Sequence, residues 1–177
     1  MKSTNALRRT HVRNTLVGGI VALGLLLPTG RIALAAESGT YAQVTSLVTN
    51  YTKSERGAET VIGGSSSGTN TTTQSSGGPF VEGSSGLMEC IVLAKKSAAG
   101  LDLEAYCTST DTAGDKVFSV AKRKSGDVNP GTAGEGRSEL LGGTGKYSGL
   151  TGNCAYKIEN LTGNRLVSIS KCQWQKP

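Results

Sequence analysis

Four cysteines are the residues of this sequence whose chemistry is easiest to specify: Cys90, Cys107, Cys154 and Cys172. Cysteines can bind a metal ion or form disulfides. Zinc sites usually contain a Cys-x₂-Cys pair or histidines, whereas the spacings here are 17, 47 and 18 residues. We therefore expect two disulfides and no metal site, and the count alone leaves three pairings open.

A glycine-rich stretch around Lys146, residues 142–152, suggests a phosphate-binding loop at first sight. The pattern G-x-x-x-x-G-K-[ST] is not met, because Leu140 occupies its first glycine position. Tyr147 also stands where the hydroxyl ligand for magnesium is needed. No G-x-G-x-x-G pattern occurs here or over residues 131–136. The sequence therefore predicts no nucleotide and no other cofactor.

The first 36 residues have the order of positive charge, apolar run and small residues that is typical of a cleavable signal peptide. The apolar run, Leu16 to Leu27, is shorter than the roughly 20 residues that span a bilayer. We expect no stable membrane anchor once residues 1–36 are removed, and an exported protein, periplasmic or extracellular. The pair Arg8 and Arg9 leaves twin-arginine export open beside the Sec route.

Removing this segment changes what the charges imply. It holds five of the 19 basic residues and none of the 13 acidic ones, so the mature chain has 14 minus 13, or +1. Basic charge is then no argument for a nucleic-acid partner. The segment also holds His11, the only histidine. A mature domain without histidine has no Ser/His/Asp or Cys/His nucleophile system.

Charged side chains in the mature chain could still do acid and base work. Paired carboxylates do so in glycosidases, and the candidates are Glu89, Glu104, Glu135 and Glu139. Alternation places Glu104 on the opposite face to Leu103 and Cys107, so we expect solvated carboxylates. The basic run 122–124 is expected on a charged edge strand that resists aggregation.

The elements that must position these residues are strands. Short stretches rich in Val, Ile, Thr and Tyr recur between glycine-containing breaks over residues 37–177, and helical periodicity is missing. This predicts a single all-β domain of about eight strands. The first strand, residues 40–53, places Tyr41, Gln43, Thr45 and Leu47 on one face. Residues 63–78, made only of Gly, Ser, Thr, Asn and Gln, fit a loop or a solvated strand equally well.

The predicted strands also select a cysteine pairing. Cys90 and Cys107 lie almost symmetrically about the turn at residues 97–100, and Cys154 and Cys172 about residues 161–164. Directly opposed residues of a hairpin lie about 4.5 to 5.5 Å apart, which suits a disulfide. We therefore predict the pairs Cys90 with Cys107 and Cys154 with Cys172.

The glycine-rich stretch resembles the strand and turn of dirigent and allene oxide cyclase barrels. The matching residues are Gly142, Gly143, Gly145, Tyr147 and Gly149. The resemblance implies a small antiparallel barrel of about eight strands whose interior can hold a small apolar ligand. Four further segments look like a family of small secreted bacterial proteins of uncharacterised activity: Met88–Cys90, Asp102–Cys107, Ala121–Lys124 and Lys171–Gln175.

These observations favour an exported β-barrel that binds a small apolar ligand or a protein surface and performs no chemistry. One alternative is a barrel enzyme or stereochemical guide of the allene oxide cyclase or dirigent type. Another is a structural protein associated with the cell envelope. The sequence assigns no catalytic residue.

Overall fold

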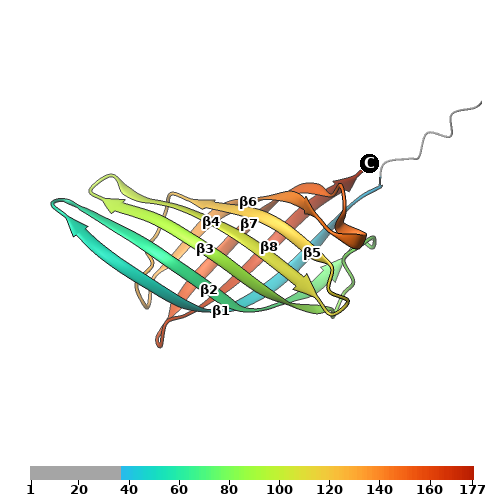
Figure 1. Cartoon of the computed structure of the whole chain (residues 1–177), viewed down its shortest axis with the longest axis horizontal. Helices are drawn as coiled ribbons and strands as arrows, with labels where there is room; N and C mark the ends of the chain where they lie inside the picture. The colour runs from blue at the N-terminus through green and yellow to red at the C-terminus, as the bar shows by residue number, and fades with distance from the viewer. Residues whose placement is uncertain (1–36) are drawn as a thin grey trace, which may run out of the picture. The chain divides into compact units, whose positions relative to one another are not determined.

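The computed structural model describes residues 37–177 and confirms the all-β prediction. Its elements are β1 (Glu37–Arg56), β2 (Glu59–Ser75), β3 (Ser85–Ser97), β4 (Gly100–Asp111), β5 (Lys116–Arg123), β6 (Ala133–Gly143), the 3₁₀ helix η1 (Gly145–Tyr147), β7 (Thr151–Leu161) and β8 (Arg165–Lys176). The eight antiparallel strands form one closed barrel (Figure 1). Within residues 37–177, no helix has the length and apolar composition needed to cross a bilayer. The predicted signal peptide, residues 1–36, lies outside the described residues.

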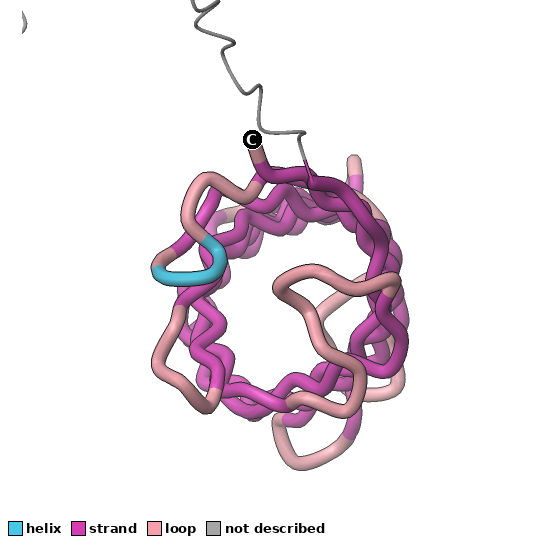
Figure 2. The backbone as a smooth tube through the Cα atoms, turned by 90° about the vertical axis from the view of Figure 1, so that its right-hand side faces the viewer, coloured by secondary structure: helices cyan, strands magenta, loops and turns pink. Residues whose placement is uncertain are grey.

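The sheet closes because each strand pairs with the next and β8 pairs with β1; Figure 2 shows the resulting ring. A path across the strands leaves β1 at Asn50 and returns to it at Thr40, which is 50 minus 40, or 10, residues away. It passes through Ser65, Ile91, Tyr106, Val120, Glu139, Asn153 and Gln173. This displacement means that the strands are tilted, and a tilted eight-stranded barrel has room inside for side chains or one small ligand.

Strand β2 takes up most of the segment that lacks apolar residues, because it extends to Ser75. Ser66 and Thr72 are buried and line the interior, whereas Thr69 and Thr73 are exposed. The period of two is therefore kept with polar residues on both faces. This arrangement is possible because the interior of the barrel is itself partly polar.

Both predicted disulfides are confirmed. Cys90 pairs with Cys107 across β3 and β4, and Cys154 pairs with Cys172 across β7 and β8. The Cα atoms lie 4.1 Å apart in the first pair and 4.0 Å apart in the second. All four cysteines except the half-buried Cys107 are buried, and Cys90, Cys107 and Cys154 line the interior of the barrel. The disulfides therefore tie neighbouring strands together from within.

An aromatic cluster closes the end of the barrel where β2 runs into β3. Its members are Tyr41, Phe80, Tyr147 and Trp174, all buried. Phe80 comes from the β2–β3 connection, and its ring stacks on Tyr41 with 3.7 Å between centroids. Such pairs stabilise a fold by about 0.5–1.5 kcal/mol beyond the area they bury. Figure 2 shows a loop that reaches over part of this opening.

A second cluster, which we call the aliphatic cluster, fills the barrel further along. It contains Leu47, Ile62, Val92, Leu101, Leu103 and Leu166, together with Cys90 and the alanines 94 and 105. Val128, from the connection between β5 and β6, packs against it. The two clusters leave a stretch of barrel interior between them in which polar side chains face inward.

Candidate functional site

The barrel encloses a cavity of about 160 Å³, lined by residues from all eight strands. A cavity of about 150 Å³ can hold benzene, so the space is large enough for a molecule of at least one ring. Among the polar side chains that line it, nine lie in its middle part: Gln43, Thr45, Ser66, Asn70, Ser109, Ser119, Ser138, Ser168 and Ser170. We call this set the polar belt. An apolar cavity that also carries several polar groups is typical of a small-molecule site.

The order of residues along single strands places the polar belt between the two clusters. On β1, Gln43 and Thr45 lie between Tyr41 of the aromatic cluster and Leu47 of the aliphatic cluster. Strand β8 repeats the order in reverse, from Leu166 through two serines to Cys172. Along β1 and β8 the wall of the cavity is therefore polar in its middle and apolar towards both ends.

Two polar atoms of the belt have no partner in the described part of the chain. Asn70 Nδ2 donates to Gln43 Oε1 at 3.5 Å and to Ser109 Oγ at 3.3 Å. Asn70 Oδ1 and Ser170 Oγ are buried without a hydrogen-bond partner in residues 37–177. Buried polar groups are nearly always hydrogen-bonded, so these atoms are available to a molecule in the cavity.

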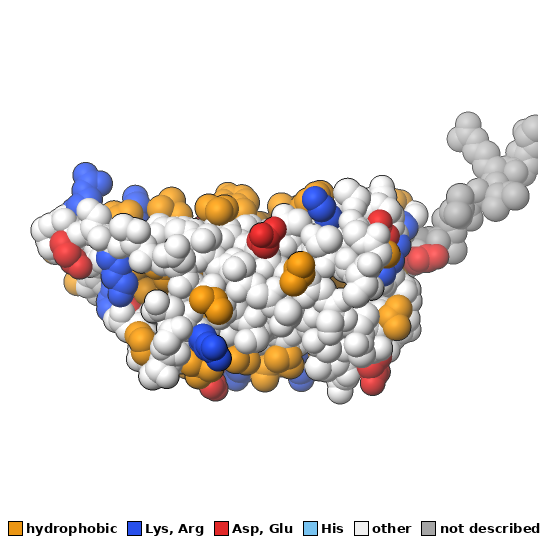
Figure 3. Space-filling model, turned by 60° about the horizontal axis from the view of Figure 1, so that its bottom comes forward, with side chains coloured by type: hydrophobic (Ala, Val, Ile, Leu, Met, Phe, Trp, Pro, Cys, Tyr) orange, Lys and Arg blue, Asp and Glu red, His pale blue; other side chains and the backbone are white. Residues whose placement is uncertain are grey.

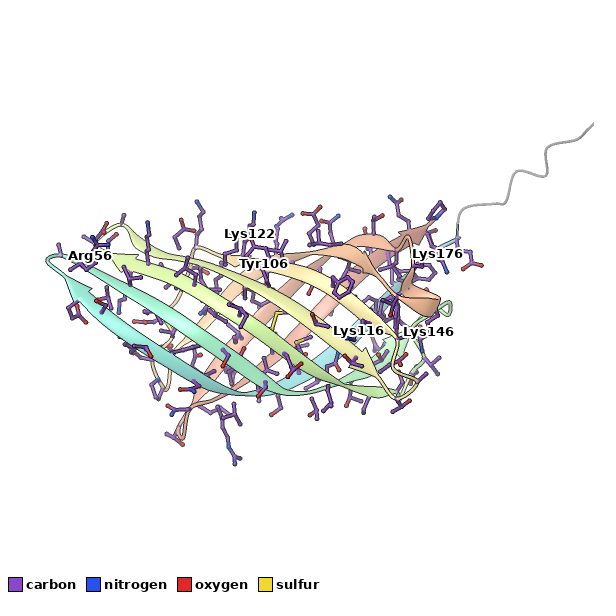
Figure 4. All side chains as sticks on the ribbon, in the orientation of Figure 1. Arg56, Tyr106, Lys116, Lys122, Lys146 and Lys176 are labelled. Atoms are coloured by element: carbon purple, nitrogen blue, oxygen red, sulfur yellow. A yellow bond between two sulfur atoms is a disulfide. The ribbon has the colours of Figure 1, made fainter. Side chains whose placement is uncertain are left out.

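The structure contradicts the expectation that the basic run 122–124 lies on an edge strand. The expected edge strand does not exist, because β5 pairs with β4 and β6 inside a closed sheet. Arg123 is only 3% exposed and lines the cavity, whereas Lys122 lies on the outer surface (Figure 4). Burial lowers the pKa of Arg123, and the nearby Tyr156, Tyr51 and Asp127 act in the opposite direction. The guanidinium group stays protonated at any physiological pH.

Two glycines of β6 make room for this side chain and for its aromatic neighbour. Gly134 and Gly136 occupy successive inward positions, with the charged Glu135 exposed between them. A Cβ atom at Gly134 would overlap Nη1 of Arg123, and one at Gly136 would overlap the ring end of Tyr156. Glycine in a strand often marks such a close approach.

The tyrosines near Arg123 are neutral hydrogen-bonding groups. Burial raises the pKa of Tyr51 and of Tyr156, and the positive charge of Arg123 only partly offsets this. Tyr156 Oη donates to the Lys122 carbonyl oxygen at 3.4 Å. At neutral pH both phenols therefore keep their protons, and neither acts as a base.

The motif Gly142, Gly143, Gly145, Tyr147 and Gly149 builds the closed end of the barrel. Tyr147 is the member that enters the aromatic cluster. Gly145 has φ +53°, and a Cβ there would overlap the carboxylate of Asp115. That carboxylate accepts a hydrogen bond from the Lys146 backbone N–H at 3.2 Å. The motif thus docks η1 against the β4–β5 hairpin.

Lys146 is held by an ion pair. Its Nζ lies 2.6 Å from Asp111 Oδ2. Burial alone would raise the pKa of Asp111, but hydrogen bonds from Lys146 and from the backbone N–H groups of Ala113 and Asp115 outweigh it, so the pKa is lowered. Among residues 37–177, Asp111 is the one carboxylate that lines the cavity, and this pairing neutralises its charge.

The four candidate glutamates lie on the outside, which confirms the expectation of solvated carboxylates. Glu89, Glu135 and Glu139 are exposed, and Glu104 is half-buried beside Lys122 with 3.3 Å between charged atoms. On the face drawn in Figure 3, apolar side chains form separate patches among polar ones. No two of these carboxylates meet in the cavity as a glycosidase pair would.

The sequence reasoning did not identify Arg123, Tyr51, Tyr156, Asn70 or Ser170 as a group. The signal in the sequence was the spacing of Gly134 and Gly136, which are two residues apart and therefore leave the inner face of one strand without side chains at two successive positions. Within residues 37–177, no three His, Cys, Asp or Glu side chains gather as metal ligands. Comparison of the chain with protein-family models, curated proteins and solved structures gave no match.

Proposed function

We propose that this protein is a binding protein that holds one small, mainly apolar molecule inside its barrel and does not alter it chemically. The observation that carries the proposal is the cavity of about 160 Å³, which is lined by members of the aromatic and aliphatic clusters and by the polar belt. Ligand sites are concave and mostly apolar, with a few polar groups that fix orientation. The interior of the barrel has this composition.

The unpartnered atoms of the polar belt support a ligand rather than a purely structural interior. Asn70 Oδ1 and Ser170 Oγ are buried in the barrel without a partner in residues 37–177. An unsatisfied buried polar group costs about 1–3 kcal/mol. A ligand that carries one or two hydrogen-bonding groups beside an apolar body would remove this cost.

Two disulfides are consistent with an oxidising, exported environment. We extend this to a periplasmic or extracellular binding protein, delivered with the help of the predicted signal peptide. The cavity would then bind molecules that are present outside the cytoplasm.

The runner-up is a barrel that guides or catalyses a reaction, as the resemblance to allene oxide cyclase and dirigent barrels implies. The observation in its favour is that Arg123, Tyr51 and Tyr156 all line the cavity. The outward direction of the four glutamates removes one set of catalytic groups that this alternative could use.

Native mass spectrometry of protein purified from its own host tests the proposal. We expect a retained molecule of about the mass of one or two rings, unchanged after incubation with the protein. Ser138→Leu, which fills the cavity, should lose it, whereas Asn153→Leu, an exposed position on β7, should keep it.

The other outcomes separate the alternatives. A retained molecule that the protein converts to a product supports the runner-up. If nothing is retained and added single-ring compounds leave the fluorescence of Trp174, the only tryptophan, unchanged, the proposal is refuted in favour of a structural role.

A further inference from the structure

The interior of the barrel contains a positive charge that no acidic side chain of residues 37–177 pairs with. In residues 37–177 the ion pairs are Lys96 with Asp127, Lys122 with Glu104, Lys146 with Asp111 and Lys157 with Glu135, and none of them includes Arg123. Arg123 Nη1 also has no hydrogen-bond partner there. A guanidinium group that is 3% exposed is thus left without a counterion.

The acidic group that acts on Arg123 does not remove this charge. Asp127 attracts Arg123, but its carboxylate already binds Lys96 and accepts hydrogen bonds from the Val128 N–H at 2.7 Å and from Asn129 Nδ2 at 3.2 Å. Buried charges in proteins are normally paired. An anion that enters the barrel would supply the partner that Arg123 lacks.

The surroundings of Arg123 fit a planar anion with an attached ring. Arginine presents a fork of N–H donors that matches a carboxylate with two parallel hydrogen bonds. Tyr51 and Tyr156 flank it with neutral phenols. On the next inward position of β5 stands Ala121, paired with Ala105 of β4, and these short side chains leave space for an apolar ring.

We propose that the ligand is a small carboxylic acid of about one or two rings, whose carboxylate binds the guanidinium of Arg123 and whose ring lies against Ala105 and Ala121. This inference rests on the proposed binding function and specifies the chemical class of the ligand. Asn70 Oδ1 and Ser170 Oγ, further along the cavity, would take a hydrogen-bond donor on the far side of the ring.

The test compares ligands that differ in charge and hardly in shape. Isothermal titration calorimetry at pH 7 measures binding of benzoate against benzamide and of indole-3-carboxylate against indole-3-carboxamide. Hydrogen bonds to charged groups are roughly twice as strong as neutral ones, and we expect the acid of at least one pair to bind about tenfold or more tightly than its amide. Arg123→Gln should abolish this preference.

A matched variant controls for net charge. Arg137→Gln removes one positive charge from the exposed outer face of β6, and it should keep the preference for the acid. Arg123→Lys keeps a charge without the planar fork and should retain part of it.

The outcomes distinguish this inference from the proposed function. Equal affinity of acid and amide for the wild-type protein overturns the carboxylate inference and leaves the binding function standing. An equal loss of acid preference in Arg137→Gln and Arg123→Gln overturns the inference too. No binding of either pair, with no molecule retained from the host, overturns both. If Arg123→Gln does not fold, the comparison of acid with amide on the wild-type protein decides.

Discussion

Replacing Arg123 by methionine should make the ligand-free barrel more stable. The guanidinium group is buried without a counterion or a partner for Nη1 in the described residues. Methionine has a similar unbranched stem and fills irregular space, so the contacts of the stem are largely kept while the buried charge is removed. Most core substitutions destabilise a protein, which makes the opposite sign informative.

The size of the gain follows from the cost of an unsatisfied buried group. That cost is about 1–3 kcal/mol for a polar group and larger for a charge, and we expect Arg123→Met to raise the free energy of unfolding by about 2 kcal/mol. The unfolding entropy of a domain is about 2.1 cal/mol/K per residue, so a barrel spanning residues 37–177 has about 0.3 kcal/mol/K. The expected rise in Tm is therefore about 7 °C.

The assay is urea unfolding followed by circular dichroism, together with a thermal melt, on protein freed of any retained molecule and with both disulfides intact. Arg137→Met is the control, because an exposed substitution changes stability by no more than about 0.5 kcal/mol. A saturating concentration of the carboxylate ligand should make the wild type more stable than Arg123→Met. At a hundred times its Kd it stabilises the wild type by about 2.7 kcal/mol and leaves Arg123→Met unaffected.

One result would refute this reasoning. The loss of a hydrogen bond to a charged group costs on the order of 1 kcal/mol or more. If Arg123→Met is less stable than Arg137→Met by about this amount, then the guanidinium group already has hydrogen-bond partners in the empty barrel. The charge would then be structural, and the case for an anionic ligand would lose its main support.

Three further predictions test other parts of the fold. Gly136→Ala should lower the free energy of unfolding by about 1–3 kcal/mol, because the new methyl group overlaps Tyr156, whereas Gly63→Ala, with open space around it, should be neutral or slightly stabilising; urea midpoints measure both. Removing one disulfide as Cys154→Ala with Cys172→Ala should cost about 3 kcal/mol, because the bond closes a loop of 18 residues; unfolding curves with and without reductant report it. The ion pair of Asp111 stabilises the barrel above the unfolded pKa of 3.8, and this contribution is lost as pH falls through the lowered folded pKa; Asp111→Asn should therefore lose less stability than the wild type between pH 6 and pH 2.

Each of these has an outcome that contradicts it. Equal effects of the two alanine substitutions would mean that the inner face of β6 is not crowded. A disulfide variant within 1 kcal/mol of the wild type, well under the expected cost, would show that the strands hold their register without the bond. Identical acid sensitivity of Asp111→Asn and the wild type would place the titrating group elsewhere.

Much of the fold could be predicted from the sequence because the signals are local. Strands follow from alternation and glycine breaks, and the pairing of Cys90 with Cys107 follows from their symmetry about one turn. The direction of Arg123 could not be predicted, because β5 has apolar residues on both faces, Val117 inward and Phe118 outward. Alternation identifies an interior only where the two faces differ.

The same reason explains the uncertainty over residues 63–78. Ser66 lines the interior and Ser67 faces out. The inner and outer faces of this strand therefore have the same residue types. Where the interior of a barrel is partly polar, its strands do not show the alternation of apolar and polar residues that predicts a strand. The residues that most suggest a function are therefore the ones that hydrophobic periodicity reveals least.

The pairing of β1 with β8 also sets the order in which this protein can fold. Every other strand pair joins neighbours in the chain, and each disulfide ties one such hairpin. The closing contact joins Glu37 to Lys176, 176 minus 37, or 139, residues apart. Contacts of such high sequence separation form slowly, because the chain entropy of a long loop must be lost first. The hairpins and the disulfides within them can therefore form before the barrel closes, whereas the enclosed lumen exists only after β8 has paired with β1.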